Sequence, residues 1–123
     1  MAKGRILIVD DTKIVCLAVE AELNDAGFEA ESAYSGDAAI EKAKAKSFDM
    51  AFVDLVMPGM DGVDTCRKLK EVSPGMKVAL ISGHPAELEG KKDQFIAAGG
   101  SDKFLRKPFM DGEVVEVATL MLS

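Results

Sequence analysis

The chain has 123 residues, of which 48% are hydrophobic and 29% charged, which is typical of one globular domain covering residues 1–123. A net charge of −6 without a basic cluster argues against a nucleic-acid surface. The first apolar run, residues 6–9, is too short for a signal peptide or a membrane span, so a cytoplasmic location is expected. Cys16 and Cys66 lack the spacing of a metal site, which favours a reducing compartment.

Strand-like and helix-like patterns alternate five times along the chain. Apolar, β-branched runs predict strands, and apolar residues at helical spacing predict helices. The short links between them favour an α/β fold with a parallel sheet, right-handed crossovers and helices on both faces. The expected strands are residues 5–9, 28–34, 50–54, 76–81 and 101–105, and the expected helices are residues 12–26, 35–46, 62–72, 92–98 and 111–122.

The first and fourth helices have irregular patterns. In the first helix, apolar pairs at positions 14/15 and 18/19 predict the face that packs on the core, and Glu22 interrupts this stripe. The fourth helix is expected to be short, because Pro85 and Gly90 weaken the helical pattern at its beginning.

Polar side chains follow four of the five expected strands. Asp10 and Asp11 come after the first strand, Asp54 ends the third, Ser82 follows the fourth and Lys107 follows the fifth. Because the carboxyl ends of parallel strands meet at one edge of a sheet, these side chains are expected to lie close together. Taken singly, each has a structural explanation, as a helix-start acid, a turn serine or a surface lysine. Their occurrence together, at the ends of four strands, indicates a functional site.

The combination of these groups favours phosphoryl chemistry. Three neighbouring carboxylates repel one another, and capture of a cation relieves that repulsion. Oxygen ligands and a phosphate partner favour Mg²⁺, which needs only one or two carboxylates. Lys107 supplies a second positive charge and Ser82 a hydroxyl donor. The sequence therefore predicts a carboxylate nucleophile at Asp54, with a metal ion and a lysine that neutralise phosphoryl charge.

In these motifs, and over essentially its whole length, the chain resembles the response-regulator receiver domains of two-component signalling. The resemblance implies a flavodoxin-like, doubly wound sheet of five strands in the order 2-1-3-4-5, with five helices. The segments that carry it are Ile6-Leu7-Ile8-Val9-Asp10-Asp11, Asp54 with Met57-Pro58-Gly59-Met60-Asp61-Gly62, Ser82, and Lys107-Pro108-Phe109.

The resemblance also implies roles for the site residues. Asp54 matches the phosphoacceptor and Lys107 the phosphate-binding lysine. Asp10 and Asp11, together with Asp54, match the acids that bind Mg²⁺, and the backbone carbonyl of Val56 matches the ligand that completes that metal site. The only catalysis expected is the domain's own phosphorylation and dephosphorylation, so no further enzyme activity is expected.

Further roles follow from the same resemblance. Ser82 and Phe104 match the hydroxyl and aromatic residues of the switch, and Pro108 is expected to follow a cis peptide bond. Val56 and His84 occupy the two positions that tune the lifetime of the phosphoryl group. His84 has two further interpretations, a solvated loop histidine or a phosphohistidine relay, and the solvated histidine is the simpler one.

The partners that the resemblance implies are proteins. A histidine kinase or histidine phosphotransferase is expected to dock on the first helix, through the outward-facing residues Ile14, Leu17 and Ala21. No output domain follows the last expected helix, so a monomer that signals to an unidentified target through protein contacts is expected, without nucleic acid or membrane.

Three alternatives remain beside this interpretation. A stand-alone receiver can act as a phosphate sink or relay intermediate with no output of its own. An aspartyl-nucleophile phosphatase is disfavoured, because it needs its nucleophile on the first strand and a second acid two residues later, where Thr12 stands. A flavodoxin is disfavoured because Asp10 and Asp11 would repel the flavin phosphate.

Overall fold

The structure, a computed structural model, describes residues 3–83 and 85–123. Within these ranges, five strands alternate with five helices. The strands are β1 (Arg5–Val9), β2 (Glu29–Ala33), β3 (Met50–Asp54), β4 (Lys77–Ser82) and β5 (Phe104–Arg106), and the helices are α1 (Lys13–Asp25), α2 (Gly36–Ala45), α3 (Gly62–Val72), α4 (Pro85–Ala97) and α5 (Glu113–Met121). None of these described helices has the length and apolar character needed to cross a membrane.

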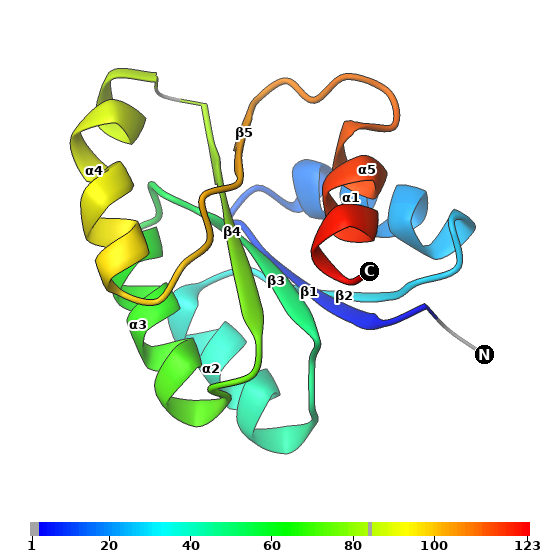
Figure 1. Cartoon of the computed structure of the whole chain (residues 1–123), viewed down its shortest axis with the longest axis horizontal. Coiled ribbons are helices and arrows are strands. Elements are labelled where there is room, and N and C mark those ends of the chain that lie inside the picture. Colours follow the sequence, from blue (N-terminus) through cyan, green and yellow to red (C-terminus); the bar gives the residue numbers. More distant parts are fainter. Residues whose placement is uncertain (1–2, 84) are drawn as a thin grey trace.

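The strands form one parallel sheet in the order β2-β1-β3-β4-β5, which confirms the flavodoxin-like topology. Helices α1 and α5 cover one face, and α2, α3 and α4 cover the other (Figure 1). Every residue of the central strand β3 is buried, as its continuous apolar run predicts for a strand covered on both sides. The sheet therefore separates two apolar cores and directs the carboxyl ends of its strands to one edge.

Helix α1 packs on the sheet through Cys16, Val19 and Leu23, which are at most 2% exposed. The expectation that Ile14 and Ala18 belong to the core face was wrong, because Ile14 is 79% exposed and Ala18 is also exposed. The apolar residues of α1 extend over more than one face of the helix, so periodicity alone does not identify the face that packs on the sheet. The contacts of α1 with β1, β2 and α5 decide which of its faces is buried.

Helix α4 has 13 residues and begins at Pro85, so the expectation of a short helix was wrong. Proline is compatible with the first turn of a helix, where a backbone N–H has no partner within the helix. Leu88 and Phe95 are buried against the sheet and stabilise the helix despite Gly90. The fifth strand was also expected too early, because residues 101–103 lead into β5 without joining it.

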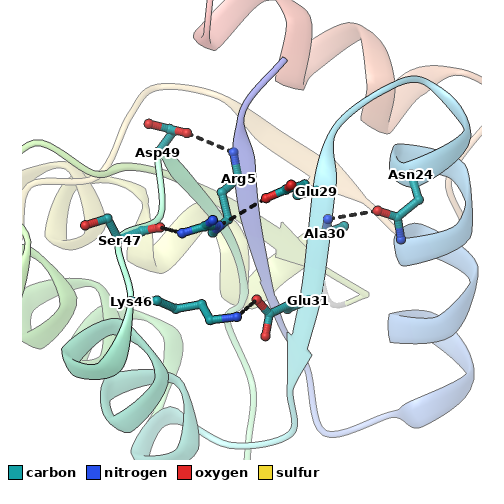
Figure 2. A network of polar contacts seen from close by, with 8 residues as sticks. All are labelled: Arg5, Asn24, Glu29, Ala30, Glu31, Lys46, Ser47 and Asp49. Atoms are coloured by element: carbon teal, nitrogen blue, oxygen red, sulfur yellow. Dashed lines mark hydrogen bonds and ion pairs between the residues drawn. The ribbon is translucent and has the colours of Figure 1, made fainter. Parts of the chain in front are cut away.

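A polar network ties the amino ends of β1, β2 and β3 together, at the edge opposite the polar strand tips (Figure 2). The backbone N–H of Arg5 donates to Asp49 Oδ2 at 2.8 Å, and its guanidinium donates to Glu29 Oε2 and to the carbonyl oxygen of Ser47, both at 3.2 Å. Arg5 also pairs with Glu29 in the parallel register of β1 and β2. This network supports the alignment of the strands whose other ends carry the acids.

Candidate metal and phosphoryl site

Four strand ends bring the predicted polar residues to one edge of the sheet. Asp10 directly follows β1, Asp54 and Ser82 are the last residues of β3 and β4, and Lys107 directly follows β5. Asp10, Asp54 and Ser82 are almost fully buried, whereas Asp11 is exposed. The site thus has a buried floor and an open acidic rim.

Three carboxylates form the acidic part of the site. Side-chain oxygens of Asp10, Asp11 and Asp54 lie within 4.8 Å of one another. Asp10 is held in place because its Oδ1 accepts the N–H of Thr12 at 2.9 Å and its backbone carbonyl accepts the thiol of Cys16 at 3.3 Å. These oxygens are the type of ligand that Mg²⁺ prefers.

The second oxygen of Asp10 is buried beside the lysine of the site. Among the described residues, Asp10 Oδ2 is buried without a hydrogen bond of good geometry, although Lys107 Nζ lies 2.6 Å away as an ionic contact. A buried carboxylate oxygen of this kind is unfavourable unless a charge compensates it. Lys107 compensates one carboxylate charge, and the cluster of three carboxylates still fits a hard divalent cation beside the lysine.

Lys107 bridges two of the acids. Its Nζ lies 2.6 Å from Asp10 Oδ2 and 3.3 Å from Asp54 Oδ2, and its backbone N–H donates to the carbonyl oxygen of Ser82 at 2.9 Å. Burial opposes its charged form, but the close contact with Asp10 and the two carboxylate charges outweigh this effect and raise the pKa of Lys107. The peptide bond between Lys107 and Pro108 is cis.

The backbone around Asp54 is tightly enclosed. The N–H of Leu55 donates to the carbonyl oxygen of Ile81, and the N–H of Gly62 donates to the carbonyl oxygen of Leu55, both at 2.9 Å. A Cβ at position 62 would lie 2.5 Å from the carbonyl oxygen of Asp54 and 2.8 Å from the Cα of Leu55. Only glycine allows the start of α3 to approach Asp54 this closely.

The carboxyl group of Asp54 has an altered acidity. Burial, followed by the charge of Asp10, raises its pKa from the ordinary 3.8 to about 6, and Lys107 and a backbone hydrogen bond from Val56 oppose this increase in part. Without a bound cation, the negative charge on Asp54 is therefore unfavourable. A divalent cation next to it would remove this repulsion.

This altered pKa predicts a pH-dependent effect of Asp54→Asn on stability. The folded protein binds the proton of Asp54 more tightly than the unfolded chain, so ionisation destabilises the fold as the pH rises through about 6. In magnesium-free buffer at about pH 7.5, Asp54→Asn should increase the free energy of unfolding by about 1–3 kcal/mol, and the gain should vanish near pH 4. Urea unfolding at both pH values measures it. A variant less stable than the wild type at the higher pH would contradict the assignment.

The remaining predicted site residues lie around this centre. Val56 is 39% exposed in the loop after β3, and Ser82 is buried beside Lys107 at the end of β4. Phe104 is half-buried on the α4 side of the sheet, where its ring centroid lies 6.2 Å from that of Phe95. His84 lies outside the described residues, so its predicted role is not examined by the structure.

The predicted partner residues Ile14, Leu17 and Ala21 are all exposed on α1. Next to them is a groove of about 570 Å³ between α1 and the loop that follows β5, which sequence analysis did not find. The two main walls of the groove come from segments about 90 residues apart, so no local sequence pattern predicts it. Its lining consists of Ile14, Val15, Ala18, Val19 and Glu22 from α1 and Gly83, Lys107, Pro108, Phe109, Met110 and Asp111 from the other side.

The fold and the site together define a doubly wound α/β domain with three clustered carboxylates and a lysine at the carboxyl edge of its sheet. Residues 6–119 match the response regulator receiver domain, and the chain belongs to this family, the receiver domains of two-component systems. Receiver domains bind Mg²⁺ at an acidic pocket, are phosphorylated on aspartate, and interact with histidine kinases and phosphotransferases. They are generally signalling modules without enzymatic activity.

Three proteins of similar sequence support the assignment to this family. The chemotaxis protein CheY of Thermotoga maritima is 32% identical over 115 residues, which cover 91% of this chain and 92% of that protein. The response regulator PleD of Caulobacter vibrioides is 35% identical over 108 residues, 88% of this chain but 24% of PleD. The cell cycle regulator CtrA of the same species is 28% identical over 90% of this chain and 47% of CtrA. The chain thus spans about half of CtrA and about a quarter of PleD.

Solved structures agree with the fold. A CheY-like receiver domain from Methanospirillum hungatei superposes with a TM-score of 0.87 at 30% identity, covering 96% of this chain and 92% of that chain. Vibrio cholerae CheY4 superposes with a TM-score of 0.88 at 28% identity, covering 98% of both chains.

Proposed function

We propose that Asp54 accepts a phosphoryl group from a phosphohistidine or a small phosphodonor in a two-component phosphorelay. The observation that carries this proposal is the position of Lys107 Nζ between the carboxylates of Asp10 and Asp54, with Asp11 completing the acid cluster. Asp10, Asp11, Asp54 and the backbone carbonyl of Val56 would hold Mg²⁺, which neutralises charge on the phosphoryl oxygens when bound.

The residues of this chain would then have separate roles in the transfer. An oxygen of Asp54 forms the new bond to phosphorus, while the bond from phosphorus to the donor breaks and its electron pair leaves with the donor. Lys107 stabilises negative charge on the transferred group, and the hydroxyl of Ser82 donates to one of its oxygens. Incubation with acetyl phosphate and Mg²⁺ should add the mass of one phosphoryl group, measured by intact-mass spectrometry, and EDTA should prevent the addition.

We propose that the exposed face formed by Ile14, Leu17 and Ala21 contacts the donor protein. The face lies on the helix that directly follows Asp10 and Asp11, so a partner bound there can present its phosphohistidine to Asp54. Leu17→Glu places a charge on an apolar contact and should slow transfer from the cognate kinase or phosphotransferase by roughly tenfold or more.

The control for this prediction is Leu120→Glu on α5. Leu120 is 58% exposed and Leu17 is 59% exposed, so both variants introduce the same charge at a similarly accessible position. Labelling by acetyl phosphate needs no partner and should differ less than about twofold among the wild type and both variants. Equal rates of transfer from the partner for Leu17→Glu and Leu120→Glu would rule out this docking face.

We further propose that Phe104 and Ser82 form the output switch. Lys92 Nζ lies 5.3 Å from the ring centroid of Phe104, and the same ammonium is 2.8 Å from Glu89 Oε1, so α4 supports the present position of the ring. Phosphorylation should draw Ser82 toward the phosphoryl oxygens and leave space for Phe104 to turn inward. Because Phe has no hydroxyl, the inward ring buries no unpaired donor, and the switch should be weakly biased.

Beryllofluoride, a phosphoryl mimic, tests this switch by NMR. Chemical shifts should change around Phe104 and along α4, in addition to the changes around Asp54. Lys92→Ala removes the cation over the ring and should move the shifts of Phe104 part of the way toward those of the activated state, even without beryllofluoride. Changes confined to the surroundings of Asp54 would exclude the mechanism.

A further inference from the structure

Glu22 connects α1 to the loop that carries Lys107. Its Oε1 accepts the backbone N–H of Gly112 at 2.9 Å, across 90 residues of sequence. Gly112 is the N-cap residue of α5 and has a φ of +80°. As a glycine, it has no side chain that could cap the helix. The carboxylate of Glu22 therefore supplies, from another helix, an acceptor and a negative charge at a helix N-terminus, both of which are favourable there.

The loop between β5 and α5, residues 107–112, depends on anchors at both ends. Strand β5 has only three residues, and the backbone N–H of Lys107 donates to Ser82 immediately after it. At the far end, Glu22 binds Gly112, while Glu113 Oε2 accepts the N–H of Met110 at 2.9 Å. The backbone that follows Lys107 is thus held by a short strand on one side and, at Gly112, by the contact with Glu22 on the other.

Glu22 is half-buried, and most of the residues that line the groove beside it are apolar, although Lys107 and Asp111 also line it. The side chain lines the apolar groove together with Val15, Ala18 and Val19 of its own helix and Phe109 of the loop. Helices α1 and α5 also meet through buried residues such as Val114, so their packing does not require Glu22. An apolar residue at position 22 would continue the stripe of α1. The acid is therefore better explained by its contact with the loop than by packing of the two helices.

We infer that Glu22 is a positioning residue for phosphoryl transfer, which acts through Gly112 on the loop and so aligns Lys107 with Asp54. This inference rests on the proposed function. Helix α1 then contributes to the site twice. It begins just after Asp10 and Asp11, and near its carboxyl end Glu22 holds the loop of residues 107–112. Small displacements of a catalytic group reduce rates strongly, so a contact outside the site can influence the chemistry.

The test compares Glu22→Leu, which removes the acceptor but fits the apolar groove, with Glu22→Gln, which keeps an acceptor oxygen. Labelling by acetyl phosphate is measured over a range of donor concentrations, because a small donor does not use the docking face. Glu22→Leu should lower the labelling rate constant by roughly three- to tenfold, and Glu22→Gln should stay within about twofold of the wild type. The matched control Glu41→Leu removes an exposed acid on α2 and should have no effect.

Two further measurements separate positioning from a structural role. Thermal unfolding should show that Glu22→Leu is folded, because the added apolar burial at position 22 offsets the lost contact with Gly112. NMR of the Lys107 side chain, without any donor, should show a shift in Glu22→Leu and none in Glu22→Gln. A folded Glu22→Leu protein that labels like the wild type, or one that labels slowly with unchanged Lys107 resonances, would overturn the inference.

The same experiment separates this inference from the proposed function. A wild-type protein that takes up no phosphoryl group would refute the proposed function, whatever Glu22 does. The Lys107 resonances would then be the test of the positioning role. A shift in Glu22→Leu but not in Glu22→Gln supports that role, and unchanged resonances in both variants overturn it.

Discussion

Replacing Asp54 with Asn is expected to abolish phosphoryl uptake from acetyl phosphate. The amide is similar in shape to the carboxylate, and Asp54 is buried at the end of β3, so the variant should fold. The amide oxygen is a poor nucleophile, and the substitution also removes one of three charges from the cluster that would hold Mg²⁺. Uptake by the variant should fall below detection by intact-mass measurement.

Asp102→Asn is the matched control for this result. Asp102 is exposed just before β5, at the edge of the sheet opposite the site, and the same chemical change there should leave uptake intact. Peptide mapping of the labelled wild-type protein should locate the phosphoryl group on Asp54. Uptake by Asp54→Asn at the wild-type rate, or equal labelling of the wild type in EDTA, would refute the assignment of the acceptor and its cation.

Replacing Gly62 with Ala is expected to damage both stability and the site. The added Cβ would lie 2.5 Å from the carbonyl oxygen of Asp54 and 2.8 Å from the Cα of Leu55, and backbone atoms cannot move aside as a flexible side chain can. The start of α3 must then shift, which should lower the free energy of unfolding by about 2–3 kcal/mol. Because the same shift displaces Asp54, labelling by acetyl phosphate should also slow.

The control is the same substitution at Gly90, inside α4. Apart from its chain neighbours and the backbone of its own helix, no described atom lies within 4 Å of the Cβ that Gly90→Ala adds, and alanine favours the helix, so this variant should be more stable by about 0.5–1 kcal/mol. Urea unfolding of both variants gives the comparison, and acetyl phosphate labelling gives the effect on the site. Equal stability of the two variants would show that the close approach at Gly62 is not a constraint.

The order of elements and the edge that carries the site were determined by the sequence alone. Apolar runs ending in Asp10, Asp54 and Ser82 predict buried parallel strands, and parallel strands place their carboxyl ends together without further information. The strand order 2-1-3-4-5 came from the resemblance to receivers, and the structure confirms it. These features are local patterns or follow from general rules of chain connection.

Tertiary structure alone decided which helix faces pack inward and which loops contact distant helices. The sequence does not specify which apolar face of α1 packs inward, so the exposure of Ile14 required the structure. Helix α4 begins at Pro85 because buried Leu88 and Phe95 stabilise it more than Gly90 weakens it. The bond from Glu22 to Gly112 joins residues 90 positions apart, and the interruption of an apolar stripe at Glu22 was its only trace in the sequence. Local periodicity records which residues share a face of one element, whereas contacts between elements depend on how the whole chain packs.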